Sequence, residues 1–137
     1  MTRAALTAWI ALIALSGCSL GSDDEKGKNE PAAGEAKQVA AAVSALDKAV
    51  RAGDWRTVCD RLFTPAARRR AGGRDCVRLV RSSAGDLRGA RIELVGIEVS
   101  KAGAQAKVRT RSKGQAALTD TLVLKRAGGG YRIDALR

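Results

Sequence analysis

The chain has 137 residues, of which 28% are charged, and its formal net charge at neutral pH is +11. It has no histidine, the residue that serves most often as a general base and as a metal ligand. Only 3% of its residues are aromatic, whereas proteins that bind single-stranded nucleic acid stack the bases on aromatic side chains. We therefore predict no nucleic-acid partner despite the positive charge, and no metal or other cofactor.

The N-terminal segment has the parts of an export signal in the right order. Arg3 precedes a 13-residue apolar run, residues 4–16, which is too short to cross a bilayer as a helix but fits the apolar core of a signal peptide. The run leads into Leu15-Ser16-Gly17-Cys18, which resembles the lipobox of bacterial lipoproteins. The alternative is a buried helix over residues 1–20, in which the cysteine is a small apolar residue. A buried helix does not explain the abrupt change to polar sequence at Gly21.

The lipobox resemblance implies a shortened and lipidated N-terminus. In that family the cysteine, here Cys18, takes a diacylglycerol on its thiol, and the signal is cut just before it. Residues 1–17 are then the signal peptide, and residues 18–34 are a lipidated N-terminus and flexible tether, because the segment is polar and rich in small residues. Residues 35–137 have the size of one domain. We expect the protein to be exported and anchored to a membrane of the cell envelope.

The two other cysteines, Cys59 and Cys76, are predicted to form a disulfide. Exported chains meet oxidising conditions, and a bridge across this 17-residue separation stabilises the fold by roughly 3 kcal/mol in the chain-entropy model. The alternatives are a redox pair, which favours the spacing Cys-x-x-Cys, and a metal pair, which needs two further ligands.

The first half of the domain has the apolar spacing of helices. A first helix is predicted over residues 35–52, followed by Gly53 as its C-terminal cap. Its buried face is predicted to carry Val39, Val43, Leu46 and Val50. Asp54 can cap a short second helix that extends to Leu62. Further helical segments are predicted to begin at Thr64-Pro65 and at Asp75.

From Gly89 onward the apolar residues alternate, which predicts strands. The alternation shifts at Gly96, as at a β-bulge, and a two-residue turn at Ala102-Gly103 is predicted to place Glu98 opposite Lys107, Val99 opposite Ala106 and Ile97 opposite Val108. Beyond the bulge, Glu93 is predicted to face Arg111 and Leu94 to face Thr110. Third and fourth strands are predicted over residues 116–126 and 131–135. Helices followed by a run of antiparallel strands predict the α+β class.

Two segments resemble the nuclear transport factor 2-like superfamily. They are "ALDKAVRAGDWRTVCDRLFTPAARR", similar to its first two helices, and the closing "LVLKRAGGGYRID". The resemblance covers residues 35–137 and implies a cone in which a long helix and shorter ones pack into a curved four-stranded sheet. Exported lipoproteins with such a domain exist, and most have no assigned activity. We therefore expect a non-catalytic binding or accessory domain, with room for a small ligand in the cone.

Asp120 is the one weak candidate for a catalytic residue. By strand alternation it shares the core-facing side of its strand with Leu118, Leu122 and Leu124, and a buried carboxylate is costly unless it is paired. Tyr131 could lie near the same cavity. The pair is similar in kind to the Tyr and Asp of ketosteroid isomerases, although no motif spacing matches. The alternative function is therefore an isomerase- or hydrolase-like enzyme, and the alternative structure is a second bulge that turns Asp120 to solvent.

Three further features of the sequence can each be interpreted in two ways. Trp55 could stack on a ligand at the mouth of the cone, but its neighbours on the helix favour a core position. The run Arg68-Arg69-Arg70 could be a partner patch, although such runs usually are solvated helix ends. A cationic stripe, consisting of Arg109, Arg111, Lys113 and Arg132, is predicted on the outer sheet face. It could bind anionic lipid headgroups or an acidic envelope polymer, or it could be an ordinary solvated face.

Overall fold

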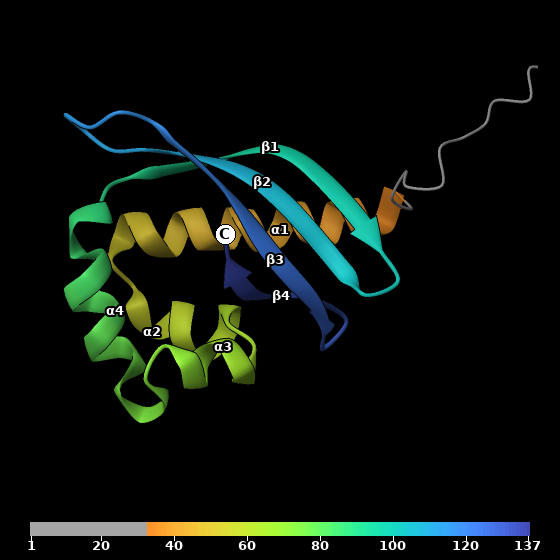
Figure 1. Ribbon diagram of the computed structural model, residues 1–137, viewed down its shortest axis with the longest axis horizontal. Coiled ribbons are helices and arrows are strands. Elements are labelled where there is room, and N and C mark those ends of the chain that lie inside the picture. The colour runs from red at the N-terminus through yellow and green to blue at the C-terminus, as the bar shows by residue number, and fades with distance from the viewer. Residues whose placement is uncertain (1–32) are drawn as a thin grey trace, which may run out of the picture.

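The computed structural model describes residues 33–137, in which helices precede an antiparallel sheet (Figure 1). The predicted signal peptide, Cys18 and most of the predicted tether lie outside the described residues. The helical part consists of α1 (Ala33–Ala52), α2 (Trp55–Thr57), the π-helical turn η1 (Val58–Leu62), α3 (Pro65–Arg70), the 3-10 turn η2 (Gly73–Asp75), α4 (Cys76–Ala84) and the 3-10 turn η3 (Gly85–Leu87). The strands are β1 (Arg91–Ser100), β2 (Gly103–Arg111), β3 (Leu118–Ala127) and β4 (Gly130–Leu136). The predicted α+β class is confirmed.

The long helix α1 buries the apolar stripe that its spacing predicts. Each stripe residue is at most 8% exposed: Val39, Val43, Leu46 and Val50. The helix begins two residues earlier than predicted and ends as predicted, because Gly53 adopts a left-handed φ of 66°. Asp54 then accepts hydrogen bonds from the backbone N–H of Thr57 at 3.1 Å and from its hydroxyl at 2.7 Å. These bonds lower the pKa of the Asp54 carboxyl.

The later helices begin near the predicted caps, by two different means. Thr64 caps α3 as predicted, because its hydroxyl accepts a hydrogen bond from the backbone N–H of Ala67 at 3.0 Å. Asp75 immediately precedes α4, but its side chain makes no capping hydrogen bond and instead pairs with Arg78 at 3.4 Å. A side-chain cap therefore does not determine where α4 begins.

The disulfide between Cys59 and Cys76 fixes α4, and its prediction is confirmed. It joins η1 to the first residue of α4, with 6.1 Å between the two Cα atoms. Both cysteines are 1% exposed. The bridge therefore holds the short helical elements together at one end of α1 (Figure 1).

The four strands form one sheet in the order β1-β2-β3-β4, and all neighbours are antiparallel. Helix α1 contacts both edge strands, β1 and β4, so the sheet curves around it (Figure 1). The described core lies between them and extends from Val39 to Ile133, with Leu124 fully buried at its centre. Residues 33–137 therefore have a hydrophobic core of their own, which is what a domain needs to fold alone.

The predicted pairing of β1 with β2 is wrong, because the turn between the two strands lies one residue earlier than predicted. The turn residues are Lys101 and Ala102, so Ile97 lies opposite Ala106, Glu98 opposite Gln105 and Val99 opposite Ala104. Gly103 is the first residue of β2. Glycine is needed there because a Cβ would collide with the Leu124 carbonyl oxygen of β3.

The same shift changes the pairs beyond the bulge. The bulge between Leu94 and Gly96 is where the sequence predicts it, but Leu94 pairs with Val108 and Glu93 with Arg109. Glu93 nonetheless forms its predicted ion pair with Arg111, at 3.3 Å, as a diagonal neighbour. Each β1 residue therefore pairs with a β2 residue two positions before the predicted partner. Because this shift is even, every side chain stays on its predicted face of the sheet.

Candidate ligand-binding cavity

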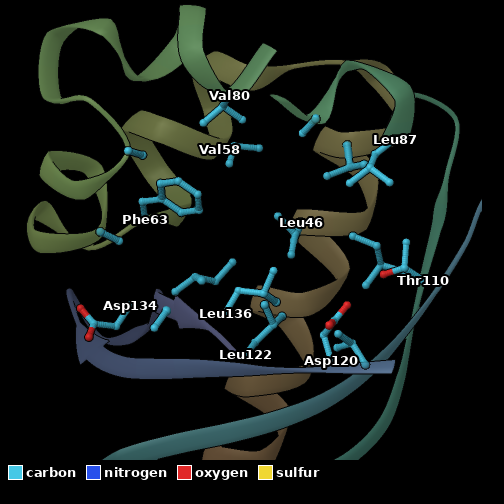
Figure 2. Close-up of a pocket in the computed structure, with 18 of the residues that line it drawn as sticks. Leu46, Val58, Phe63, Val80, Leu87, Thr110, Asp120, Leu122, Asp134 and Leu136 are labelled. Atoms are coloured by element: carbon cyan, nitrogen blue, oxygen red, sulfur yellow. The ribbon is translucent and has the colours of Figure 1, made fainter. Parts of the chain in front are cut away.

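A cavity of about 580 Å³ lies between the inner face of the sheet and the helices (Figure 2). Its walls are mainly apolar, and side chains from α1, η1, α4 and the sheet all contribute. Representative lining residues are Leu46, Val58, Phe63, Val80 and Leu122. The polar lining residues are Arg70, Thr110, Asp120 and Asp134. Sites for small molecules typically have volumes of about 300–1,000 Å³, apolar walls and a few polar groups.

Asp120 projects from β3 into this cavity, as its place in the strand alternation predicts (Figure 2). Leu122 on the same face is buried, and Thr110 of β2 lines the cavity close to Asp120 (Figure 2). Asp120 has no ion pair and no side-chain hydrogen bond with any residue from 33 to 137. Leu118 also lines the cavity but is 60% exposed, because it begins β3 next to a turn that extends beyond the helices (Figure 1). Leu118 therefore does not lie in the core, as predicted, but at the mouth of the cavity.

Asp134 contributes the second carboxylate, on another side of the cavity (Figure 2). It accepts a hydrogen bond from the Thr64 hydroxyl at 2.7 Å, and Lys125 Nζ lies 3.2 Å from its other oxygen. Arg70 lies 3.6 Å from the carboxylate and also donates to the Asp134 carbonyl. These contacts, the Thr64 hydrogen bond above all, lower the pKa of the Asp134 carboxyl. Asp134 thus links α3 to β4, and its carboxylate oxygens already bind Thr64, Arg70 and Lys125.

Tyr131 does not line the cavity with Asp120, so a Tyr–Asp pair there is not formed. Its side chain is 7% exposed, and its hydroxyl donates a hydrogen bond to Glu35 at 3.3 Å. Burial raises the pKa of the Tyr131 hydroxyl. Arg126 lies over the ring at 5.6 Å and pairs with Glu35 at 2.6 Å, so this group joins the start of α1 to the β3–β4 hairpin.

Trp55 is buried, and it also lines the cavity. It is 4% exposed, which confirms the predicted core position. The indole therefore belongs to the wall of the cavity rather than to an exposed stacking platform. The sequence offers the core and the mouth of the cone as alternatives for Trp55, whereas the structure combines them, because the lining of the cavity depends on the spacing between distant elements.

The cationic stripe is divided by the structure. Arg109 and Arg111 lie exposed on β2, and Lys113 lies in the turn that follows it. Arg132 instead lines a groove with arginines of the helical layer. The run from Arg68 to Arg70 is divided too: Arg68 pairs with Asp60 at 3.2 Å, whereas Arg70 pairs with Asp134. Anion binding by the stripe stays a prediction.

Residues 33–137 contain neither a metal-binding cluster nor a membrane-spanning helix. No group of three or more Cys, Asp or Glu side chains in this range is placed to hold a metal ion. None of the helices in the range is both long and apolar enough to cross a membrane. No protein family, curated protein or solved structure compared with the chain matches it.

Proposed function

We propose that this protein is a non-catalytic lipoprotein of the cell envelope that holds an apolar small molecule in the cavity between its helices and its sheet. The observation that carries the proposal is the cavity itself, with about 580 Å³ of space and mainly apolar walls. Pockets that hold small molecules typically have about 300–1,000 Å³ of space and mainly apolar walls. The volume and the lining of this pocket therefore support its use as a ligand site.

The proposal includes a nuclear transport factor 2-like fold and a lipid anchor. The long helix α1, the shorter helices and the antiparallel sheet that curves around α1 support the first part. The sequence Leu15-Ser16-Gly17-Cys18 supports the second, since it follows an apolar run of signal-peptide length. The anchor would keep the cavity close to a membrane, a source of apolar molecules.

Trp55 provides the test, because it is the sole tryptophan in residues 18–137 and lines the cavity. The protein is made as residues 18–137 with Cys18→Ser, so that it stays in solution. N-phenyl-1-naphthylamine, an apolar fluorophore, is titrated in. We expect saturable quenching of Trp55 emission together with increased probe emission, because the probe enters apolar surroundings beside the indole.

A pair of matched variants locates the bound probe. Ala84→Phe adds bulk to the cavity wall and is expected to weaken probe binding about tenfold, since overpacking a filled site costs about 1–3 kcal/mol. Ala41→Phe adds the same ring on the exposed side of α1 and should leave binding unchanged. Equal binding by both variants would remove the support for a ligand cavity.

Asp120 favours a second candidate function, an isomerase- or hydrolase-like enzyme that acts on an apolar substrate. A carboxylate without a partner, directed into an apolar cavity beside the Thr110 hydroxyl, is suited to general base catalysis. The assay would use a β,γ-unsaturated ketone and a p-nitrophenyl ester. Turnover that Asp120→Asn abolishes, with probe binding intact, would establish the enzyme and reject the non-catalytic proposal.

A further inference from the structure

A second hollow lies on the surface between the helical layer and β4, and its lining is charged, unlike that of the apolar cavity. Its volume is about 390 Å³, and four arginines line it. They come from three elements: Arg68 and Arg69 from α3, Arg74 from η2 and Arg132 from β4. We call this hollow the arginine groove. Its single acidic lining residue is Asp60, so the groove has a large excess of positive charge.

Most of that positive charge is not neutralised within the domain. Arg68 pairs with Asp60 at 3.2 Å. Arg69, Arg74 and Arg132 form no ion pair and no side-chain hydrogen bond with any residue of the described range 33–137. Each guanidinium carries five N–H donors in a planar fork. Three unpaired forks around one hollow repel one another, and an anion bound between them would relieve that repulsion.

The groove is built on fixed parts of the fold. Thr64 caps α3, and its backbone N–H donates to the Ile133 carbonyl at 2.9 Å, which holds α3 next to Arg132. Gly72 and Gly73 reverse the chain after α3, with φ of 104° and 57°. Gly72 also admits the Leu79 side chain, since a Cβ there would collide with it. The disulfide at Cys76, two residues after Arg74, then fixes η2.

We propose that the arginine groove binds a phosphate group. Guanidinium forks match phosphate oxygens through paired hydrogen bonds, and such charge-assisted bonds are about twice as strong as neutral ones. A phosphate group offers several acceptor oxygens at one point, which suits three guanidinium groups that line the same hollow. The group can belong to a soluble phosphorylated molecule or to the headgroup of a membrane lipid. This inference is independent of the apolar cavity and of any ligand there.

The test compares both sources with one set of variants, in residues 18–137 with Cys18→Ser. Inorganic pyrophosphate is titrated by calorimetry, and flotation is measured with vesicles of phosphatidylglycerol in phosphatidylcholine against phosphatidylcholine alone. The groove variant is Arg69→Gln, Arg74→Gln and Arg132→Gln. The matched control removes three exposed charges elsewhere: Lys37→Gln, Lys48→Gln and Lys101→Gln.

We expect the parent to bind at least one probe and the groove variant to bind it at least about tenfold more weakly, because three charge-assisted contacts are lost. The control should change binding by less than about twofold, apart from general screening effects. Binding of pyrophosphate alone identifies a soluble ligand, and selective flotation with phosphatidylglycerol identifies a lipid headgroup. Absence of both, or equal losses in the groove variant and the control, overturns the proposal.

A lysine series keeps the test decisive if the groove variant does not fold. Arg69→Lys, Arg74→Lys and Arg132→Lys retain the charge but remove the planar forks. Circular dichroism and thermal melting first establish that this variant folds as the parent does. Its affinity for the probe should then fall several-fold. Unchanged affinity would overturn recognition by guanidinium groups.

Discussion

Asp134 occupies an irregular position in β4 that ties together three parts of the chain. The register of β3 with β4 shifts between Val123 and Leu124, and Asp134 is the extra residue. Its carboxylate can therefore reach the Thr64 hydroxyl of the α3 cap, Arg70 and Lys125 at once.

The lowered pKa of Asp134 predicts how the stability of the domain depends on pH. Asp134→Asn should reduce the free energy of unfolding at pH 7 by about 1–2 kcal/mol, because hydrogen bonds to a charged group are lost. The folded-state pKa lies below the ordinary 3.8, so this stabilisation is present above the unfolded-state pKa and disappears as the pH falls through the folded-state pKa.

Urea unfolding at a series of pH values measures the effect. The difference between parent and variant should be constant near neutrality and shrink below about pH 4, where the Asp134 carboxylate takes up a proton. Asp86→Asn, an exposed site in η3 without an ion pair in the described residues, serves as the control and should change little. A difference that is the same at every pH would contradict the assignment.

At the scale of elements, the disulfide is the main cross-link of the helical layer. The double variant Cys59→Ser, Cys76→Ser should lower the free energy of unfolding by roughly 3 kcal/mol, mostly through the greater freedom of the unfolded chain. Urea unfolding with and without dithiothreitol provides the measurement. Reductant should shift the parent to the stability of the variant and leave the variant itself unchanged. A parent that is insensitive to reductant would refute a stabilising bridge.

The elements that sequence predicts well are those governed by neighbouring residues. The stripe of α1, the cap at Thr64 and the alternation that directs Asp120 inward all depend on local spacing. The turn at Lys101-Ala102 is missed, because the need for glycine at position 103 comes from the carbonyl of Leu124 on another strand. The sequence predicts room for a ligand in the cone only through the family resemblance, and it does not predict which residues line the cavity or the arginine groove. Both are gaps between elements that only tertiary packing brings together.

At the scale of the whole molecule, the proposed anchor makes a prediction about Cys18. In cells fed a palmitate analogue, the protein should be labelled and fractionate with membranes, and Cys18→Ala should abolish the labelling. The variant Cys59→Ser, Cys76→Ser is the control and should still be labelled, because those cysteines are bonded to each other. Unlabelled parent protein released into the medium would reject the anchor.

The order of the sheet has a further consequence, for the route by which the chain folds. Each strand is bonded to the strand that precedes or follows it in sequence, and the disulfide spans only 17 residues. Each hairpin of the sheet and the bridge therefore closes a short loop, which costs little chain entropy, whereas α1 packs against β1 and β4 across much longer separations in sequence. A hairpin of two consecutive strands can form as soon as the second strand is free to pair with the first. On the proposed export route, the chain that leaves a translocation channel thus needs no distant partner segment to begin its sheet.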